Sequence, residues 1–276
     1  MAVRIGLSGW SYPHWRDTFY LKDLPQVEWL RYVAERFPTV EVNRTFYSLL
    51  RPDVYRQWVG QVPDHFTFSI KGSRFITHLK SLRDVEIPLA NFFASGVLEL
   101  QGHLDTVLWQ LPARTRVSSQ NVIGFLSLLP ATLEEAARLA AKHDERAPEV
   151  AIPATDAVPI RHALEIRNPD ILDADLLEAA RSRNVALARS HSSRWPLVDV
   201  DTADFAYFRL HGPGRLYASR YGPEHLDVWQ DRIIRIADER DVLVYFDNDE
   251  NGHAPRDALD LMERLMNRPK KAASSE

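Results

Sequence analysis

The sequence contains no cysteine among its 276 residues. Disulfide bonds, thiolate metal sites and cysteine nucleophiles are therefore excluded, and the composition fits a reducing compartment. The opening residues, MAVRIGLSGW, lack the long apolar core of a signal peptide. No uninterrupted apolar run approaches the ~20 residues that a membrane span needs. We therefore expect a soluble cytoplasmic protein with no membrane partner.

An excess of basic residues is also lacking. The chain has 34 Lys and Arg against 38 Asp and Glu, a net charge of −4, so it has no overall electrostatic footprint for nucleic acid. With 45% hydrophobic residues it can bury a sizeable core, which excludes disorder for most of its length. Barrels of about 250 residues commonly form one domain. We assign residues 1–268 to a single domain and residues 269–276 to a flexible C-terminal tail.

Short strands with one polar face organise the sequence. In Thr39–Tyr47, Glu41 and Asn43 alternate with Val40 and Val42, so a carboxylate and an amide share one face. Similar alternation recurs along the chain. We predict strands at Val3–Ser8, within Thr39–Tyr47, and at Phe66–Lys71, Asp105–Leu111, His162–Arg167, Val185–Ser190, Asp204–His211 and Asp241–Asp247. Helical patterns separate most of them, which predicts an α/β fold: a single (β/α)₈ TIM-like barrel with parallel strands.

Polar side chains stand at the carboxyl ends of these strands, where barrels of this type place their active sites. They are Glu41, Asn43, Lys71, Gln110, Glu165, Arg167, Arg209, His211, Asp247, Asn248 and Asp249. A charged layer needs an explanation, because barrel interiors are normally apolar. One explanation is a buried ion-pair network that is purely structural. The other is a preorganised pocket for a polar or anionic small molecule.

In the pocket interpretation, the two arginines and Lys71 clamp a carboxylate or phosphate group by charge-assisted hydrogen bonds. Glu41 or Glu165 acts as general base, and His211 acts as acid or orienting donor. Two alternatives stay open. Lys71 can act as a Schiff-base nucleophile, since neighbouring cations lower the pKa of an amine. The three carboxylates Glu41, Glu165 and Asp247 could hold a divalent metal with His211, but no HExxH motif supports this, and we predict no cofactor.

Aromatic residues follow several strand ends: Trp10, Tyr12, Trp15, Phe46, Tyr47, Tyr217 and Tyr221. Their rings can stack on a sugar or a base, and arginine adds cation–π contacts. Alternatively they form a small hydrophobic core under the loops. We favour the loop core for Phe46 and Trp15, and keep both interpretations for Trp10, Tyr47 and Tyr217.

Several segments together resemble a known family, the domain of unknown function 72, or YecE-like, family. The matching segments are IGLSGWSYPHWRDTFY, EWLRYVAERFPTVEVNRTFY, FTFSIKGSRFITH, LWQLP, LEIR, YFRLHG and YFDNDENGHAPRDAL. They cover nearly the whole chain in order. The resemblance implies a TIM-like barrel and no particular reaction. Two departures from the family pattern are Asn168-Pro169-Asp170 after the fifth strand, and Asp247 where an asparagine is usual.

The resemblance marks a set of residues in this sequence: Trp10, Glu41, Asn43, Phe46, Tyr47, Lys71, Thr77, His78, Gln110, Glu165, Arg167, Arg209, His211, Gly212, Tyr217 and Asn248. From both arguments we predict catalytic roles for Glu41, Lys71, Glu165 and His211. We predict substrate binding by Trp10, Asn43, Tyr47, His78, Gln110, Arg167, Arg209, Tyr217 and Asn248.

The leading functional hypothesis is an enzyme of hydrolase, lyase or isomerase type. Its substrate is a small polar or anionic molecule, such as a sugar or phosphate derivative. The alternative hypothesis is a non-catalytic protein that binds a metabolite, or nucleic-acid phosphates through the aromatic and arginine-bearing loops.

Overall fold

The computed structural model describes residues 1–114, 117–147, 149–154 and 156–267. Residue 268 and the predicted tail at 269–276 lie outside these ranges. Within them, nine strands form one sheet, and all neighbouring strands are parallel. The sheet order is β6-β5-β4-β3-β2-β1-β9-β8-β7. The strands are β1 (Val3–Leu7), β2 (Thr39–Val42), β3 (Thr67–Lys71), β4 (Leu104–Gln110), β5 (Arg161–Glu165), β6 (Val185–Leu187), β7 (Arg189–His191), β8 (Phe205–Leu210) and β9 (Asp241–Phe246).

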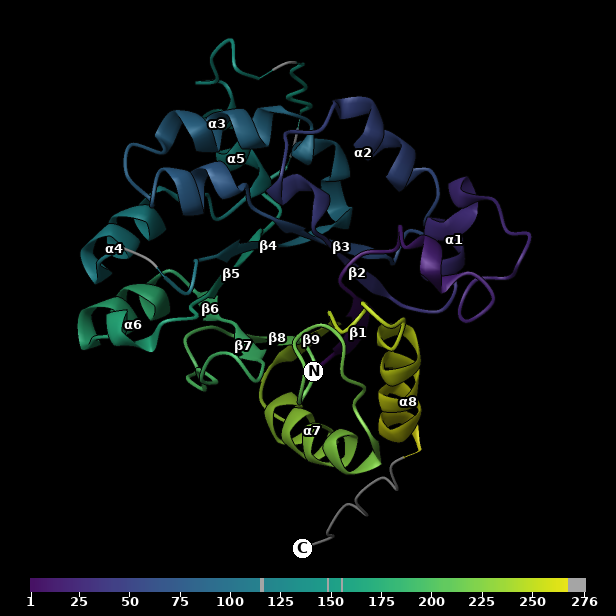
Figure 1. Cartoon of the computed structure of the whole chain (residues 1–276). Helices are drawn as coiled ribbons and strands as arrows, with labels where there is room; N and C mark the ends of the chain where they lie inside the picture. The colour runs from purple at the N-terminus through teal and green to yellow at the C-terminus, as the bar shows by residue number, and fades with distance from the viewer. Residues whose placement is uncertain (115–116, 148, 155, 268–276) are drawn as a thin grey trace, which may run out of the picture.

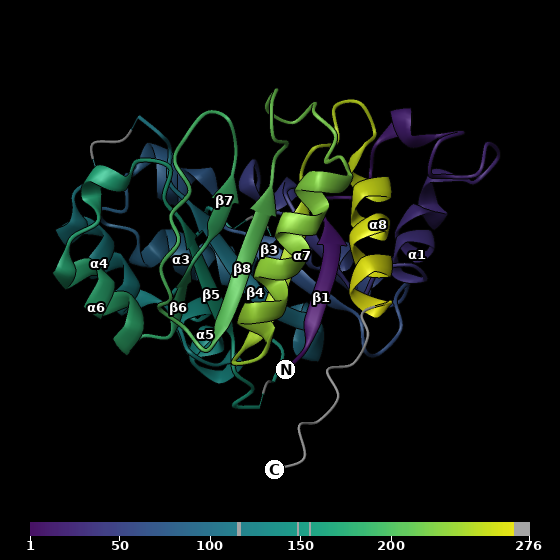
Figure 2. The same ribbon diagram turned by 90° about the horizontal axis from the view of Figure 1, so that it is seen from below.

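Helices surround this sheet, which curls into a barrel (Figure 1). They are α1 (Trp29–Ala34), α2 (Pro52–Val59), α3 (Glu86–Ala94), α4 (Ser119–Leu128), α5 (Leu133–Ala140), α6 (Ala174–Ser182), α7 (Pro223–Ala237) and α8 (Ala254–Met266). Helices α7 and α8 lie on one side of the barrel, and α2, α3 and α5 lie on the opposite side (Figure 1). In the side view the strand arrows point to the same end of the barrel (Figure 2). The predicted parallel TIM-like barrel is confirmed.

The predicted strand Val185–Ser190 is not one uninterrupted strand. Its first part, β6, pairs with β5, and β7 pairs with β8. Between them, the Ala188 N–H donates a hydrogen bond to the Leu164 carbonyl of β5 at 2.9 Å. The same stretch of chain therefore pairs first with one neighbour and then with the other, which closes the barrel between β5 and β8.

Side chains alternate between the two sides of the barrel wall, as predicted. In β8, Phe208 and Leu210 belong to a core cluster shared with α7 and α8, whereas Tyr207 belongs to a second cluster inside the barrel. Arg209 shares the interior side of Tyr207 because side chains two positions apart face the same way. The interior cluster is Leu108, Ala163, Ala186, Ala188, Phe205, Tyr207, Leu243 and Tyr245. Its apolar layer lies beneath the polar strand ends.

The two ends of the barrel differ. Near the start of the strands, Arg4 pairs with Asp105 at 2.7 Å, and Arg161 pairs with Asp241 at 2.7 Å. The strands end at the opposite face, where the loops that carry the predicted site begin. None of the helices in the described ranges has both the length and the apolar character needed to cross a membrane.

Candidate active site

Arg209 is the centre of the polar layer. Its side chain is 0% exposed and lies between carboxylates from three other strand ends. Nε and Nη2 donate to the two oxygens of Glu41 at 2.8 and 2.6 Å. Nη1 donates to Glu165 Oε2 at 2.6 Å, and Nη2 also donates to Asp247 Oδ2 at 3.0 Å. The three carboxylates hold the pKa of Arg209 well above its ordinary value, although burial acts in the opposite direction. The predicted charged residues thus meet around one guanidinium.

Glu41 is fully buried and saturated with donors. Besides the two bonds from Arg209, its Oε1 accepts from the Ser8 hydroxyl at 2.9 Å. Its Oε2 accepts from the Tyr207 hydroxyl at 2.8 Å. A carboxylate with four donors is held in one orientation. Glu41 is therefore a fixed acceptor group beneath the surface of the site.

Glu165 has a similar setting. Oε1 accepts from Arg167 Nε at 2.5 Å and from the Ser190 hydroxyl at 3.1 Å. Burial alone would raise the pKa of Glu165, but Arg167 and Arg209 outweigh it and hold this pKa well below its ordinary value. Arg167 stacks over Trp195, with its Cζ 3.9 Å from the ring centroid. Trp195 in turn donates its indole N–H to the Ser190 hydroxyl at 3.0 Å. Trp195 and Arg167 therefore cover this side of the centre.

His211 links the centre to Asp247. Its Nε2 lies 3.0 Å from the Ser190 hydroxyl oxygen, and its Nδ1 lies 2.9 Å from Asp247 Oδ2. Burial, and then the charge of Arg209, lower the pKa of His211, so the ring is neutral at neutral pH. Although burial opposes it, Arg209 and His211 lower the pKa of Asp247, whose side chain keeps 12% exposure. The His211 ring therefore lies between Ser190 and Asp247.

Lys71 differs from the other cations. Its residue is 8% exposed, and no hydrogen bond or ion pair holds its Nζ within the described residues. The amine lies 4.3 Å from the centroid of the Phe46 ring. Burial, and next the charge of Arg209, lower the pKa of Lys71 to about 8, while the carboxylates around Arg209 oppose this shift. Near neutral pH a measurable fraction of this amine is uncharged.

Three other predicted residues lie in the loops over the centre. Tyr217 packs edge-on against His211, with ring centroids 5.4 Å apart, and adopts a left-handed backbone at φ +61°. His78 packs edge-on against Phe46, and burial followed by the Lys71 charge lowers the pKa of His78 to about 4. Tyr47 is 68% exposed, so its ring is accessible from solvent. Phe46 is 8% exposed, consistent with the predicted loop core.

Two predicted binding residues are committed to neighbouring backbone instead. Gln110 lies beside Glu165 in the sheet register, and its side-chain amide donates to the Leu111 carbonyl at 3.1 Å. Asn248 is 0% exposed, and its amide donates to the Ser219 carbonyl at 3.0 Å and to Asp257 Oδ2 at 2.8 Å. Asn248 therefore fastens the loop before α7 to α8, and its role in substrate binding stays a prediction. Its burial could not be anticipated because Asp257 lies on a later helix.

The metal alternative has no geometric support. In the described parts of the chain, no group of three or more His, Asp or Glu side chains is arranged to hold a metal ion. The carboxylates proposed for that role, Glu41, Glu165 and Asp247, all bind the guanidinium of Arg209 instead. Their negative charge is thus partly offset by a side chain of the protein itself.

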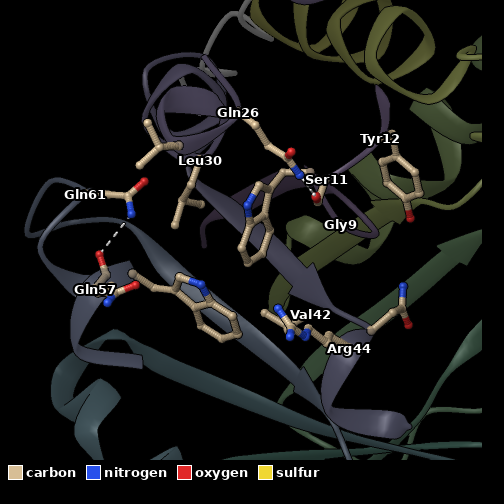
Figure 3. Close-up of a pocket in the computed structure, with 13 residues that line it drawn as sticks. Gly9, Ser11, Tyr12, Gln26, Leu30, Val42, Arg44, Gln57 and Gln61 are labelled. Carbon is tan, nitrogen blue, oxygen red and sulfur yellow. Dashed lines mark hydrogen bonds between the residues drawn. The ribbon is translucent and has the colours of Figure 1, made fainter. Parts of the chain in front are cut away.

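Figure 3 shows a cavity of about 370 Å³ whose lining includes none of the charged residues of the centre. It lies among the loops after β1 and β2, the segment leading into α1, and α2 with the turn that follows it. Two predicted binding residues, Trp10 and Asn43, line it. The Asn43 amide donates to the Ser8 carbonyl at 3.2 Å, and the Ser8 hydroxyl donates to Glu41. The cavity and the centre therefore share a wall at the end of β1.

Four residues of the centre were not predicted: Ser8, Ser190, Trp195 and Tyr207. Tyr207 precedes Arg209 by two positions in the predicted strand, so its place on the same face was available from the alternation. Ser8 and Ser190 end predicted strands, but serine is common in loops and gave no chemical indication. Nothing in the sequence indicates that Trp195, in the loop after β7, reaches back to Ser190.

The fold and the centre define a (β/α)₈-type barrel protein with a polar site at the carboxyl ends of its strands. The profile described as "Protein of unknown function DUF72" matches residues 4–276. The chain belongs to this family, as the sequence motifs predicted.

Individual relatives agree. The chain is 26% identical over 236 residues to the UPF0759 protein YecE of Escherichia coli. This aligned region covers 84% of this chain and 80% of YecE. It is similar to a DUF72 family protein of Thermotoga maritima, with a TM-score of 0.74 and 22% identity, covering 96% of this chain and 100% of that one. A DUF72 family protein of Enterococcus faecalis gives a TM-score of 0.70 and 18% identity, over 98% of this chain and 99% of that one. The two structures support the fold alone.

Proposed function

We propose that the protein is an enzyme of hydrolase, lyase or isomerase type that acts on a small polar or anionic substrate, such as a sugar or phosphate derivative. The observation that carries this proposal is the state of Lys71. Arg209 has three carboxylate partners and Arg167 has one, whereas Lys71 has none within the described residues. A cation without a partner at a strand end is free to meet a carboxylate or phosphate group of a ligand.

The proposal gives the carboxylates different roles from those expected. Glu41 and Glu165 are 0% exposed and bound to Arg209, so they set the electrostatic field rather than contact the substrate. Proton transfer is then assigned to Asp247, whose side chain is partly exposed. Its Oδ2 lies 2.9 Å from Nδ1 of His211. Lys71 binds the substrate and, in its uncharged form, can also react with it.

Ligand binding to Lys71 variants tests the proposal. Sugar phosphates are screened by thermal shift and titrated calorimetrically against the native protein, Lys71→Met, and the control Lys22→Met at an exposed position. A true ligand stabilises the native state by about 2.7 kcal/mol at a hundredfold excess over Kd. We expect Lys71→Met to weaken binding by about tenfold or more and Lys22→Met to leave it unchanged. Equal binding by both variants would refute the role of Lys71.

Borohydride separates the two roles of Lys71 for a substrate that carries a carbonyl group. The uncharged amine adds to the carbonyl carbon, and loss of water leaves an imine. Borohydride reduces this imine to a secondary amine, which mass spectrometry detects at Lys71. A mass increase at Lys71 assigns lyase-type covalent chemistry. Binding without a mass increase assigns an electrostatic role.

A second candidate is a non-catalytic binding protein for a metabolite or for nucleic-acid phosphates. The complete burial of Glu41 and Glu165 favours it, because neither can abstract a proton from a bound ligand. Ligand binding without turnover under all conditions would support this candidate. For nucleic acid, affinity should fall steeply as salt rises. The cytoplasm is the proposed compartment, on the cysteine-free composition alone.

A further inference from the structure

The cavity beside the charged centre is built from the ends of several elements (Figure 3). Gln57 and Gln61 lie on one side of it, and Gln26 and Ser11 lie across from them. Its volume of about 370 Å³ is within the range of small-molecule sites. Among its lining residues only Arg44 carries a charge, and that side chain is exposed. The cavity therefore suits an uncharged group.

Two residues of the lining, Asn43 and Gln61, each carry a buried side-chain oxygen that has no partner in the described parts of the protein. The amide nitrogens of both side chains are used. Asn43 Nδ2 donates to the Ser8 carbonyl at 3.2 Å, and Gln61 Nε2 donates to the Gln57 carbonyl at 3.2 Å. These bonds orient each amide so that its oxygen is the free atom. Since buried acceptors without partners are costly, a ligand with hydroxyl or amide donors would relieve both.

Two tryptophans and Tyr12 supply the aromatic part of the lining. The Trp10 and Trp58 rings are 5.2 Å apart and nearly perpendicular, at 87°. Trp58 is held in place by a stacked contact with Phe68 and an edge contact with Tyr55. Perpendicular rings cannot enclose a planar base between two parallel faces. They do suit a puckered ring that has C–H groups on its faces and donors around its edge.

We propose that this cavity binds the neutral, hydroxylated ring of a sugar, with Asn43 and Gln61 accepting hydrogen bonds from its hydroxyl groups. The proposal rests on the proposed function, because it places the uncharged part of that substrate. Asn43 and Tyr12 both donate to the Ser8 carbonyl, at 3.2 and 2.7 Å. The Ser8 hydroxyl also donates to Glu41. A sugar ring bound to Asn43 is therefore separated from the charged centre by one residue, Ser8.

Saturation-transfer NMR with named probes tests this inference. The probes are D-glucose, D-xylose, methyl β-D-glucoside, D-glucose 6-phosphate and adenosine, each at millimolar concentration. We expect saturation transfer to the ring protons of at least one neutral sugar and none to adenosine. Gln61→Leu should lower the affinity for that sugar by about fivefold or more, because one acceptor is lost. The matched control Gln120→Leu, at an exposed position of α4, should not change it.

Lys71→Met separates this inference from the proposed function. Binding of the neutral sugar should survive this substitution, whereas added affinity from a phosphate group should disappear. If Lys71→Met has no effect on D-glucose 6-phosphate but Gln61→Leu still weakens the neutral sugar, the sugar cavity stands and the role of Lys71 fails. No saturation transfer to any sugar, equal binding by Gln61→Leu, or preferential binding of adenosine would overturn the inference.

Discussion

The charged centre around Arg209 and the cavity beside it share a wall, but they differ in how fully their side-chain oxygens are hydrogen-bonded. In the centre, each oxygen of Glu41 and Glu165 accepts a hydrogen bond from another side chain. In the cavity, the side-chain oxygens of Asn43 and Gln61 have no partner in the described structure. Satisfied buried groups stabilise a fold, whereas unsatisfied ones indicate a missing donor. The carboxylates of the centre are therefore held rigidly, and the cavity offers the acceptors that the proposed sugar would use.

The largest expected effect is on the centre. Arg209→Met leaves Glu41 buried without a counter-ion and removes one charged partner from Glu165 and Asp247, so the free energy of unfolding should fall by about 3–5 kcal/mol. Denaturant titration followed by circular dichroism measures it. Arg215→Met is the control, because the Arg215 side chain is 75% exposed in its ion pair with Glu250 and should change stability by no more than about 0.5 kcal/mol. Similar small losses in both variants would show that the buried ion pairs of Arg209 contribute little to the stability of the fold.

The second prediction concerns Lys71, the cation to which the proposed function assigns ligand binding. Because the pKa of Lys71 is lowered to about 8, its uncharged fraction at pH 7 exceeds that of an ordinary lysine by about two orders of magnitude. Acylation by a small anhydride should therefore rise with pH and reach half-maximum near pH 8. Unfolded lysine binds its proton more tightly than Lys71, so this group also makes stability rise between about pH 8 and 10.5.

Peptide mass spectrometry over a pH series gives the midpoint, with exposed Lys22 as internal reference. A midpoint for Lys71 near that of an ordinary lysine would contradict the lowered pKa. It would also remove the main reason for assigning reactivity to this amine.

Tyr207→Phe is expected to have a moderate effect. It removes the hydroxyl that donates to Glu41 Oε2 at 2.8 Å, while Ser8 and Arg209 continue to bind this carboxylate. The free energy of unfolding should fall by about 1–2 kcal/mol. Tyr47→Phe, at a residue 68% exposed, is the matched control and should change it by less than about 0.5 kcal/mol. Equal effects would mean that the hydroxyl of Tyr207 contributes nothing specific.

The smallest effect should come from the cavity. Gln61→Leu replaces an amide whose oxygen lacks a partner by an apolar group of similar size. Removing an unsatisfied acceptor offsets the loss of the bond to the Gln57 carbonyl, so stability should change by no more than about 0.5 kcal/mol. Thermal and denaturant unfolding measure it. A loss above about 1.5 kcal/mol would show that Gln61 stabilises the fold. Weaker sugar binding by Gln61→Leu would then reflect lost stability rather than a lost contact with the sugar.

Alternation along single strands was enough to predict the barrel and much of its centre. Val40 and Val42 face the helices because they flank Glu41, and the same period places Arg209 inside. Alternation says nothing about distances between strands, which depend on how the barrel closes. The sequence therefore placed Glu41, Glu165 and Arg209 at one end, but did not show that one guanidinium binds both carboxylates.

The cavity was harder to predict because its wall is assembled from element ends. Gln61 follows α2 by two residues, and Gln26 lies before α1, where exposed amides are common. Their approach depends on how α1 and α2 pack on the sheet. Likewise no glycine or proline marks the change of partner at Ala188, between β6 and β7. Such features follow from tertiary packing rather than from periodicity.

The bonds of Arg209 reach residues 168, 44 and 38 positions away in the chain. Contacts of such separation form late in folding, since long loops must close first. A barrel that has not yet docked β2 or β9 would carry unbalanced charge in its interior. We therefore expect the barrel to close cooperatively. Truncated or strand-exchanged forms of the chain should be less stable, because they would leave these charges unpaired.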